Sequence, residues 1–247
     1  MDEKEQFAQM VKQSRRIVAF TGAGMSTESG VPDFRSAGGL FDALSGNYFS
    51  GEETLSIGFL RSYPRLFFKN YARYFDFSKA EPNAGHRFFA DLEKLGKDVT
   101  VVTQNIDNLH QLAGSTNVIE LHGNGTKWRR LDEMERMDEA LVRMDEDGMQ
   151  RDADGEMVRP DIVLYGEALD EDAMQNARTA IRNADMLIVI GTSLNVYPAA
   201  AFIDYFKGPF AVLINRTAVP AMERFQLAIQ TDAAAFLADV WGTYFRM

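Results

Sequence analysis

Glycine and polar residues follow several short apolar runs of this chain, at points where they could hold a ligand. The segment GAG at 22–24 comes directly after the apolar run Ile17–Phe20. Glycines at such a point let backbone N–H groups approach a pyrophosphate, and the N-terminus of a following helix adds its dipole. The dinucleotide fingerprint G-x-G-x-x-G is incomplete because its last position is Thr27. Taken alone, the loop also fits a tight strand-to-helix turn.

A second polar group follows the run Val99–Thr103. Gln104, Asn105 and Asp107 are too polar for packing, and ligands of open α/β sheets bind beyond the carboxyl ends of the strands. A helix cap would account for Asn105 and Asp107 but would give Gln104 no role. These residues are therefore candidates for ligand binding.

A third run, Val118–Leu121, is followed directly by His122, and Gly123 then gives the backbone room. With an ordinary pKa near 6.5, a histidine suits general base catalysis at neutral pH. A single histidine is more often structural, and that is the role we expect for His86 and His110.

The runs that position these residues are short and nearly continuous in apolar residues, as parallel strands are when both faces are covered. They are Ile17–Phe20, Val99–Thr103, Val118–Leu121, Met186–Ile190 and Phe210–Ile214. Helical stretches at 4–14, 84–95 and 172–183 alternate with them, which predicts a doubly wound parallel α/β sheet. The last two runs are followed by Gly191–Val196 and Asn215-Arg216, so polar groups are expected along one edge of the sheet.

Two insertions interrupt this alternation. Residues 38–80 are rich in aromatic side chains and are expected to form a helical lobe packed on the sheet. Residues 124–160 hold many charges and the turn sequences DEDG and DADG. One amphipathic helix is expected there, with Leu131, Met134, Met137, Leu141 and Val142 on its apolar side. The expected domains are a sheet domain of 1–37, 81–123 and 161–247, a helical insertion of 38–80 and a small module of 124–160.

The composition excludes several classes of protein. Among 247 residues, 26 are Lys or Arg and 36 are Asp or Glu, and the net charge of −10 argues against nucleic acid as a partner. There is no cysteine, which excludes disulfides, thiolate metal sites and thiol nucleophiles. No apolar run approaches the ~18 residues of a membrane span, and the N-terminal segment lacks a signal-peptide core. We expect a soluble, cytoplasmic protein with no membrane partner.

Six segments together resemble the motifs of the sirtuin family, in that family's order and over most of the chain. They are GAGMSTESGVPDFR (22–35), TQNIDNLH (103–110), LHG (121–123), RPDIVLYGE (159–167), GTSLNVYPAA (191–200) and VLIN (212–215). The resemblance implies an NAD-dependent protein deacylase with a Rossmann-type sheet domain, an inserted helical lobe and a small second module. It implies NAD as the cofactor and an acyl-lysine protein or peptide as the substrate, and we expect a monomer.

The resemblance also implies roles for individual residues. The residues implied in NAD binding are Gly22, Ala23, Gly24, Asp33, Phe34, Arg35, Gln104, Ile106, Gly191, Thr192, Ser193, Asn215, Arg216 and Asp232. Those implied in catalysis are His122, Asn105 and Asp107, and those implied in substrate binding are Gly166, Glu167, Leu194, Asn195 and Val196. Phe34 shields the reactive ribose carbon in this assignment, while Asp33 and Asp107 orient the nicotinamide carboxamide.

The implied reaction transfers the acyl group to ADP-ribose. The acyl-lysine amide oxygen attacks the anomeric carbon as nicotinamide leaves, and His122 then deprotonates a ribose hydroxyl so that the 2′-oxygen attacks the imidate carbon. Water completes the release of lysine and O-acyl-ADP-ribose. In this family the peptide lies as an added strand between two loops, here Gly166-Glu167 and Leu194–Val196.

The chain departs from the family in its small module, where most sirtuins bind a structural zinc ion through four cysteines. Counted back from Arg159-Pro160, those positions fall near Arg130, Glu133, Arg151 and Asp154. We therefore expect no metal site, and our hypothesis is that crossed salt bridges, Arg130 with Asp154 and Arg151 with Glu133, replace the metal. The alternative is a module held only by its apolar helix.

Acyl preference and two rival functions stay open. Sirtuins that prefer acidic acyl groups carry a tyrosine and an arginine three residues apart, but this chain has Asn70 and Arg73 there. An acetyl or another neutral acyl group is therefore expected. The rivals are an NAD-consuming mono-ADP-ribosyltransferase or NAD hydrolase on the same scaffold, and a catalytically idle NAD-binding module. The intact Asn105, Asp107 and His122 favour deacylation.

Overall fold

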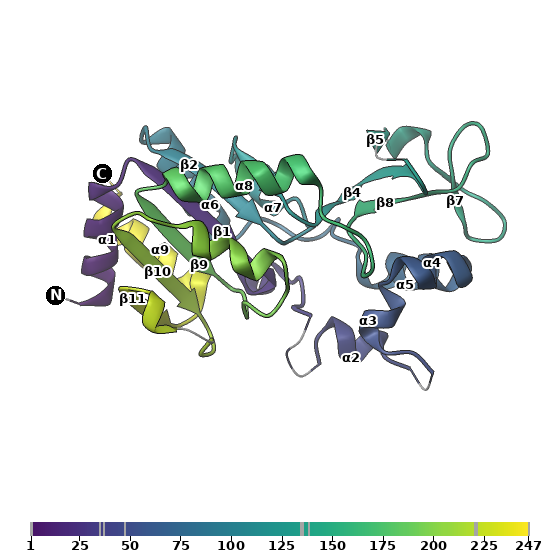
Figure 1. The fold of residues 1–247 in the computed structure, drawn as a ribbon, viewed down its shortest axis with the longest axis horizontal. Helices are drawn as coiled ribbons and strands as arrows, with labels where there is room; N and C mark the ends of the chain where they lie inside the picture. The colour runs from purple at the N-terminus through teal and green to yellow at the C-terminus, as the bar shows by residue number, and fades with distance from the viewer. Residues whose placement is uncertain are drawn as a thin grey trace.

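A computed structural model of the chain describes residues 2–34, 36, 38–46, 48–133, 136–137, 139–219 and 222–246. Its centre is a six-stranded parallel sheet in the order β11-β10-β9-β1-β2-β3 (Figure 1). The strands are β1 (Arg16–Thr21), β2 (Asp98–Thr103), β3 (Val118–Glu120), β9 (Met186–Ile190), β10 (Phe210–Asn215) and β11 (Leu227–Gln230). This is the strand order of the Rossmann fold, with its switch point between β1 and β9. The expected fold class is confirmed, although the sequence did not indicate β11.

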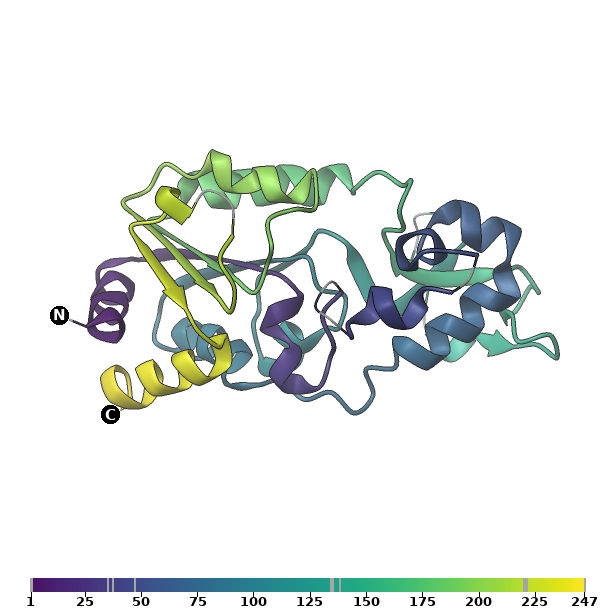
Figure 2. The same cartoon turned by 90° about the horizontal axis from the view of Figure 1, so that it is seen from below.

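Helices cover both faces of the sheet, because side chains alternate between the faces along each strand. Ile17 and Ala19 lie in one core with α1 (Glu3–Gln13), α6 (Ala84–Lys94) and α9 (Ala233–Tyr244). Val18 and Phe20 lie in the other, with α8 (Glu171–Asn183) and η4 (Ala199–Tyr205). Figure 2 shows α8 and α9 on opposite sides of the strands. None of the helices in the described ranges has both the length and the apolar character that crossing a membrane requires.

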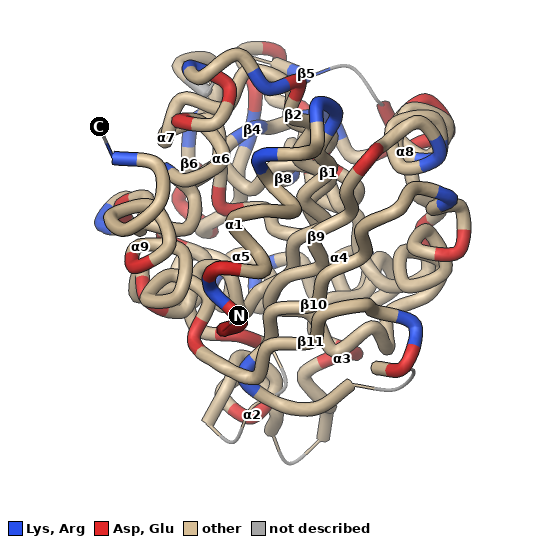
Figure 3. Tube along the Cα trace, turned by 90° about the vertical axis from the view of Figure 1, so that its left-hand side faces the viewer, with Lys and Arg blue, Asp and Glu red and all other residues tan. Residues whose placement is uncertain are grey.

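Positions of Lys, Arg, Asp and Glu are spread along the helices and loops around the central strands, as the Cα trace seen along the long axis shows (Figure 3). Helix starts carry part of the acidic charge: Asp2 caps α1, Asp170 caps α8 and Asp232 caps α9, each accepting a backbone N–H of the first turn. Carboxylates in these positions offset the helix dipole and satisfy N–H groups that have no partner within the helix.

The helical lobe consists of four helices: α2 (Leu40–Leu44), α3 (Gly51–Thr54), α4 (Ile57–Ser62) and α5 (Pro64–Tyr74). Their core includes Phe59, Phe67 and Tyr71 together with Ile162 and Leu164, and the buried side chains described in it include none from the six central strands. The lobe is helical as expected, but the expectation that it packs on the central sheet was wrong. It packs on a second, smaller sheet.

That second sheet is antiparallel and has the order β5-β4-β8, with β4 (Gly123–Arg130), β5 (Arg136–Met137) and β8 (Val158–Ile162). The 3₁₀ segment η3 (Glu139–Leu141) and the hairpin of β6 (Arg143–Met144) and β7 (Gln150–Arg151) complete the small module. The amphipathic helix expected over 131–142 was therefore wrong, and Met134 lies outside the described residues. The chain reverses here instead, because Arg129 and Arg136 on paired strands both reach Asp161.

The expected salt bridges of the small module are half correct. Arg130 pairs with Asp154 at 2.5 Å as expected, and also with Asp152 at 2.6 Å. Arg151 pairs with Asp145 at 2.6 Å. The structure describes the side chains of both Arg151 and Glu133 but shows no ion pair between them, and Glu133 lies 3.7 Å from Arg130 instead. Asp145 lies in the β6–β7 turn. It is not one of the four positions to which the family's cysteines map. The division into the three expected domains stays a prediction.

Candidate functional site

A cavity of about 760 Å³ lies beyond the carboxyl ends of the central strands, and each strand end contributes to its wall. The lining residues at the ends of the six strands include Gly22 after β1, Gln104 after β2, His122 after β3, Gly191 after β9, Asn215 as the last residue of β10 and Thr231 after β11. The structure thus brings glycine, hydroxyl, amide and imidazole groups together at the switch point of the sheet, where ligands of such sheets bind.

Glycines form the centre of this wall because two loops approach each other backbone to backbone. A Cβ atom on Gly24 would lie 2.8 Å from the Cα of Gly191, and one on Gly22 would lie 2.9 Å from the Gly191 carbonyl oxygen. Gly191 itself has a φ of +61° and leaves no room for a side chain against Met25. The expected helix after the glycines is absent here. Two 3₁₀ turns, η1 (Ala23–Met25) and η2 (Thr27–Ser29), take its place, so the expected helix dipole contributes little.

Asn105 and Asp107 are held by Ser26 in a buried polar cluster. The Ser26 hydroxyl donates to Asp107 Oδ2 at 2.6 Å and accepts from Asn105 Nδ2 at 3.1 Å, while Asn105 also donates to the Gly22 carbonyl at 3.0 Å. Burial raises the pKa of Asp107, although hydrogen bonds from Ser26 and the Leu109 N–H work against this. Asp107 lies behind the cavity wall, whereas Asn105 lines the cavity.

Two buried histidines lie behind this cluster, with ring centroids 4.7 Å apart. His86 Nδ1 accepts the Asn83 N–H at 3.2 Å, so the neutral ring carries its hydrogen on Nε2, which lies 3.4 Å from Ser26 Oγ. Burial, with the charge of Arg87, lowers the pKa of His86 to about 3. Burial also lowers the pKa of His110 well below its ordinary value, and its Nδ1 has no hydrogen-bond partner among the described residues. Neither histidine lines the cavity, and the structural role expected for both stays a prediction.

His122 is the histidine that lines the cavity. Its Nδ1 lies 2.9 Å from the Gln104 carbonyl oxygen. A carbonyl can only accept, so Nδ1 carries the hydrogen and the neutral ring keeps its lone pair on Nε2. Burial lowers the pKa of His122, and the Gln104 carbonyl only partly offsets this. At neutral pH the residue is therefore an unprotonated base.

The far end of the cavity, beyond β10 and β11, is charged. Arg216 donates to Asp232 at 2.9 Å and to the Thr27 hydroxyl at 3.1 Å. Hydrogen bonding to Asp232, together with partial desolvation, raises the pKa of Glu28 to about 7. Burial opposes ionisation of Asp232, but hydrogen bonds from Glu28 and Arg216 lower its pKa. Asn215 lines the same end, and its amide donates to the Thr217 carbonyl at 2.8 Å.

The opposite end is apolar and belongs to the helical lobe and the second sheet. Phe34 lies against Phe41 and Phe75, with ring centroids 5.5 and 6.5 Å away. Asp33, also at the cavity, accepts from the backbone N–H and the hydroxyl of Ser36. Arg35, which the family resemblance implies in NAD binding, lies outside the described residues.

Most of the predicted site residues line this one cavity, but three do not. Leu194 is buried in the core under α8, Asn195 is exposed, and Asp107 lies behind the wall. The lining residues that the sequence reasoning missed are Thr27, Ser36, Leu55, Phe75, Ile162, Val163, Leu164, Tyr165, Ala168, Leu169, Met174, Tyr197, Pro198, Ile214, Thr217, Thr231 and Ala233. The apolar run Ile162–Leu164, directly before Gly166-Glu167, was the available signal. Leu55 and Phe75 reach the site only through the lobe's tertiary packing.

No group of three or more His, Asp or Glu side chains suited to a metal ion occurs within the part of the chain that the structure describes. The strand-end groups instead suit a dinucleotide: glycine backbones for the pyrophosphate, and amides and hydroxyls for the sugars. The fold and the site thus define a Rossmann-type dinucleotide-binding protein that carries a base at one end of its cleft.

Comparison with known proteins identifies the family. Residues 22–198 match the model of the Sir2 family. A protein of Cutibacterium acnes named NAD-dependent protein deacetylase is 51% identical over 214 residues, which are 87% of each chain. A protein of the same name from Clostridium tetani is 42% identical over 97% of this chain and 98% of its own.

Solved structures agree with this match. A Sir2 structure with a p53 peptide and NAD⁺ has a TM-score of 0.84 at 35% identity and covers 98% of both chains. Another, of a Sir2 variant with a deacetylated p53 peptide and 3′-O-acetyl ADP-ribose, has a TM-score of 0.85 at 33% identity and covers 96% of this chain and 97% of its own. The chain belongs to the Sir2 family, the sirtuins.

The buried histidines predict a loss of stability in acid. Below pH 6.5 the unfolded chain binds protons at His86 and His110 that the folded chain, with lowered pKa values, does not. The free energy of unfolding should therefore fall by about 1.4 kcal/mol per pH unit for each histidine as pH drops from about 6 toward 4. Urea titrations of the unmodified chain and of His86→Gln at pH 7, 6 and 5 measure this. The variant should lose the contribution of one histidine, and equal slopes for the two chains would contradict the assignment.

Proposed function

We propose that the protein is an NAD-dependent protein lysine deacylase, acting on acetyl groups, that releases nicotinamide and O-acyl-ADP-ribose. The observation that carries the proposal is an unprotonated His122 at one end of a cavity built from all six strand ends. The relatives named NAD-dependent protein deacetylase, at up to 51% identity, support it. So do the related structures with peptide and NAD⁺ or 3′-O-acetyl ADP-ribose.

The cavity suits NAD in two parts. The glycine loops after β1 and β9 leave backbone room for the pyrophosphate, and Asn215 and Asp232 lie where the adenosine half would bind. Bound NAD supplies a nicotinamide leaving group and an ADP-ribose acceptor for the acyl group. Asn105 and the Ile106 backbone then lie at the nicotinamide end.

The residues of the chain contribute positioning, exclusion of water and one base. Asn105 is fixed by the Ser26 hydroxyl and the Gly22 carbonyl, so its geometry is set before a ligand arrives. Phe34 and Phe75 place apolar rings beside this end and reduce the access of water. His122 Nε2 accepts the proton of a ribose hydroxyl, and the hydrogen bond from Nδ1 to Gln104 holds the ring in the required tautomer.

We infer a neutral acyl group as the substrate. The lining residues from the lobe and second sheet are apolar, among them Leu55, Phe75 and Ile162, and Arg216 at the far end is the one Lys or Arg among the described lining residues. Arg73, the position that would recognise an acidic acyl group, is exposed and lies over the ring of Tyr74 at 5.2 Å. The two rival functions, ADP-ribosyl transfer or NAD hydrolysis and idle NAD binding, have no observation of their own in their favour.

We also propose that the small module keeps its structure without zinc. Arg130 bridges Glu133, Asp152 and Asp154, and Arg151 bridges Asp145, at the place where the family's cysteines would lie. Exposed ion pairs alone contribute little to stability. Trp128 and Met149 of the module add apolar packing against the lobe. The cytoplasmic location, the monomeric state and the absence of a nucleic acid partner stay predictions from the sequence.

Deacylation is tested by mass spectrometry of an acetyl-lysine peptide incubated with NAD and the protein. We expect loss of the acetyl group with formation of nicotinamide and acetylated ADP-ribose. His122→Ala should slow product formation by ~10²–10⁴-fold, because the general base is gone. Consumption of NAD without loss of acetyl would favour ADP-ribosyl transfer or hydrolysis. No consumption with acetyl, propionyl and succinyl peptides would favour the idle binding module.

The pH profile tests the role of His122 as a base. Its lowered pKa keeps the ring unprotonated down to pH values below the ordinary 6.5. We therefore expect kcat/KM to stay level as the pH falls from 8 to 6.5 and to decline only below that, read where circular dichroism shows a folded chain. An acidic limb with its midpoint at pH 7 or above would contradict this assignment.

Metal removal tests the zinc-free module. Dialysis against EDTA should change neither the Tm nor the rate, since the ion pairs of Arg130 replace the metal in this proposal. Arg130→Met should lower the Tm more than the control Arg224→Met, which removes an exposed pair with Asp204 outside the module. A Tm that falls after EDTA treatment and recovers with zinc would refute the proposal.

A further inference from the structure

Arg159 is a fully buried arginine next to the substrate end of the cavity. It lies in β8 with 0% of its side chain exposed. Its guanidinium donates twice to Glu167, from Nη1 to Oε1 at 2.6 Å and from Nη2 to Oε2 at 2.9 Å. Nη2 also donates to the Ile162 carbonyl at 2.5 Å, and Nε donates to the Pro160 carbonyl at 3.3 Å. Such a two-pronged pair fixes both the position and the orientation of the carboxylate.

Glu167 uses the same carboxylate to hold its own loop. Oε2 accepts the Leu164 N–H at 2.8 Å, and the Glu167 N–H donates to the Leu164 carbonyl at 3.0 Å. Burial opposes ionisation of Glu167, but the hydrogen bonds from Arg159 and Leu164 outweigh it and lower its pKa. Gly166, between them, has a φ of +91° that disfavours other residues. Both carboxylate oxygens are thus engaged within the protein, so Glu167 would shape the loop and not reach the peptide with its side chain.

The loop that this pair fixes is part of the cavity wall. Residues 162–167 all line the cavity. The far side of the loop is bonded to the lobe, since the Tyr165 N–H donates to the Leu55 carbonyl and the Ile57 N–H to the Tyr165 carbonyl, both at 3.0 Å. The Val163 N–H donates to the His122 carbonyl at 2.9 Å. The loop therefore connects the lobe, the base and β8, and Arg159 holds it from beneath.

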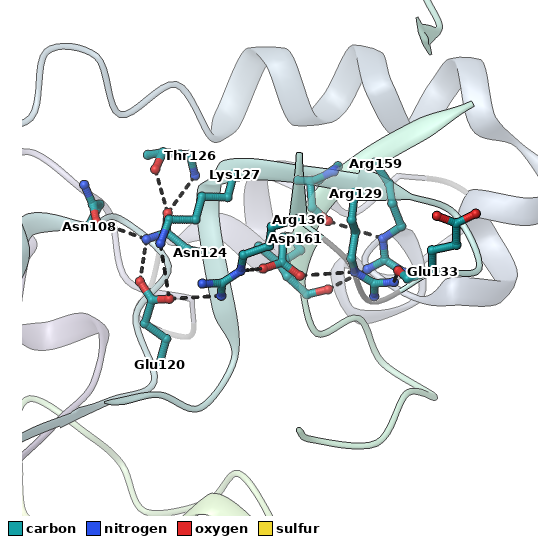
Figure 4. A network of polar contacts seen from close by, with 12 residues as sticks. Asn108, Glu120, Asn124, Thr126, Lys127, Arg129, Glu133, Arg136, Arg159 and Asp161 are labelled. Atoms are coloured by element: carbon teal, nitrogen blue, oxygen red, sulfur yellow. Dashed lines mark hydrogen bonds and ion pairs between the residues drawn. The ribbon is translucent and has the colours of Figure 1, made fainter. Parts of the chain in front are cut away.

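A chain of alternating charges extends from Glu167 through Arg129, Asp161 and Arg136 to Glu120, and Figure 4 labels all of these except Glu167. Arg129, with 8% of its side chain exposed, lies 3.7 Å from Glu167 and 3.2 Å from Asp161. Arg136 then joins Asp161 to Glu120, two residues before His122. Three arginines and three carboxylates thus alternate along this chain. Each buried charge has a neighbour of opposite sign, which offsets the cost of removing it from water. Arg159 is the one that reaches the substrate loop by hydrogen bonds.

We infer that Arg159 is a positioning residue for the peptide, acting through Glu167 on the edge formed by residues 163–167. The inference rests on the proposed function, because it assigns this edge to an acyl-lysine peptide that binds in extended form. Main-chain recognition of that kind depends on the placement of the receiving strand. A shift of the loop therefore weakens peptide binding before it affects the nucleotide half of the cavity.

Binding of a fluorescein-labelled acetyl-lysine peptide, measured by anisotropy without NAD, tests this apart from catalysis. Arg159→Lys keeps the charge but loses the two-pronged geometry, and Glu167→Gln keeps the shape but loses the charge. We expect each to raise the peptide Kd by about tenfold, the effect of one weakened charged hydrogen bond. The KM for NAD should stay unchanged in both. Arg151→Met, which removes the Asp145 pair in the same module, is the matched control and should leave the peptide Kd unchanged.

The possible outcomes separate the inference from the proposed function. An unchanged peptide Kd in folded Arg159→Lys and Glu167→Gln overturns the inference, as does an equal loss of peptide and NAD affinity. A change of the same size in Arg151→Met also overturns it, because general loosening of the module would then be the cause. If the unmodified chain binds the peptide and the variants bind it more weakly, the inference holds. If, in addition, no nicotinamide is released from NAD, that second result counts against the proposed function alone.

Discussion

The loops after β1 and β9 meet backbone to backbone at the switch point of the sheet, and the geometry of the cavity depends on this contact. Gly24 and Gly191 leave no space for a side chain between them. The Gly22 carbonyl accepts from Asn105 at 3.0 Å, so the same loop also fixes the amide that follows β2. A larger residue at any of these glycines would separate the loops and move Asn105 with them.

Burial of polar groups behind the cavity has two linked effects. Asn105, Asp107 and Ser26 satisfy one another, so the cluster is rigid without exposure to water. The same low-dielectric surroundings keep His86 uncharged and lower the pKa of His122. An available base at neutral pH and sensitivity of the fold to acid therefore share one physical cause, the removal of water from this edge of the sheet.

The sequence predicts the central strands well because parallel strands covered on both faces are nearly continuous in apolar residues, as in Met186–Ile190. It also predicts the strand-end groups, since these follow the strands directly. The sequence-based prediction fails where contacts between distant segments determine the local structure. The helix expected over 131–142 is lost to pairing of β4 with β5, with Arg136 bound to Asp161, and no local pattern shows that pairing. Likewise, Leu194 belongs to a motif but turns inward into the core.

The turns of the small module fix two carboxylates, Asp145 and Asp152, in the same way. Asp145 and Asp152 each begin a tight turn of the same form, D-x-D-G, in which the first aspartate accepts two backbone N–H groups from its own turn. Each also accepts an arginine Nε at 2.6 Å, from Arg151 and Arg130 respectively. The turns hold the carboxylates in place, so less side-chain entropy is lost when each arginine binds. One turn is thus joined to β7 through Arg151 and the other to β4 through Arg130.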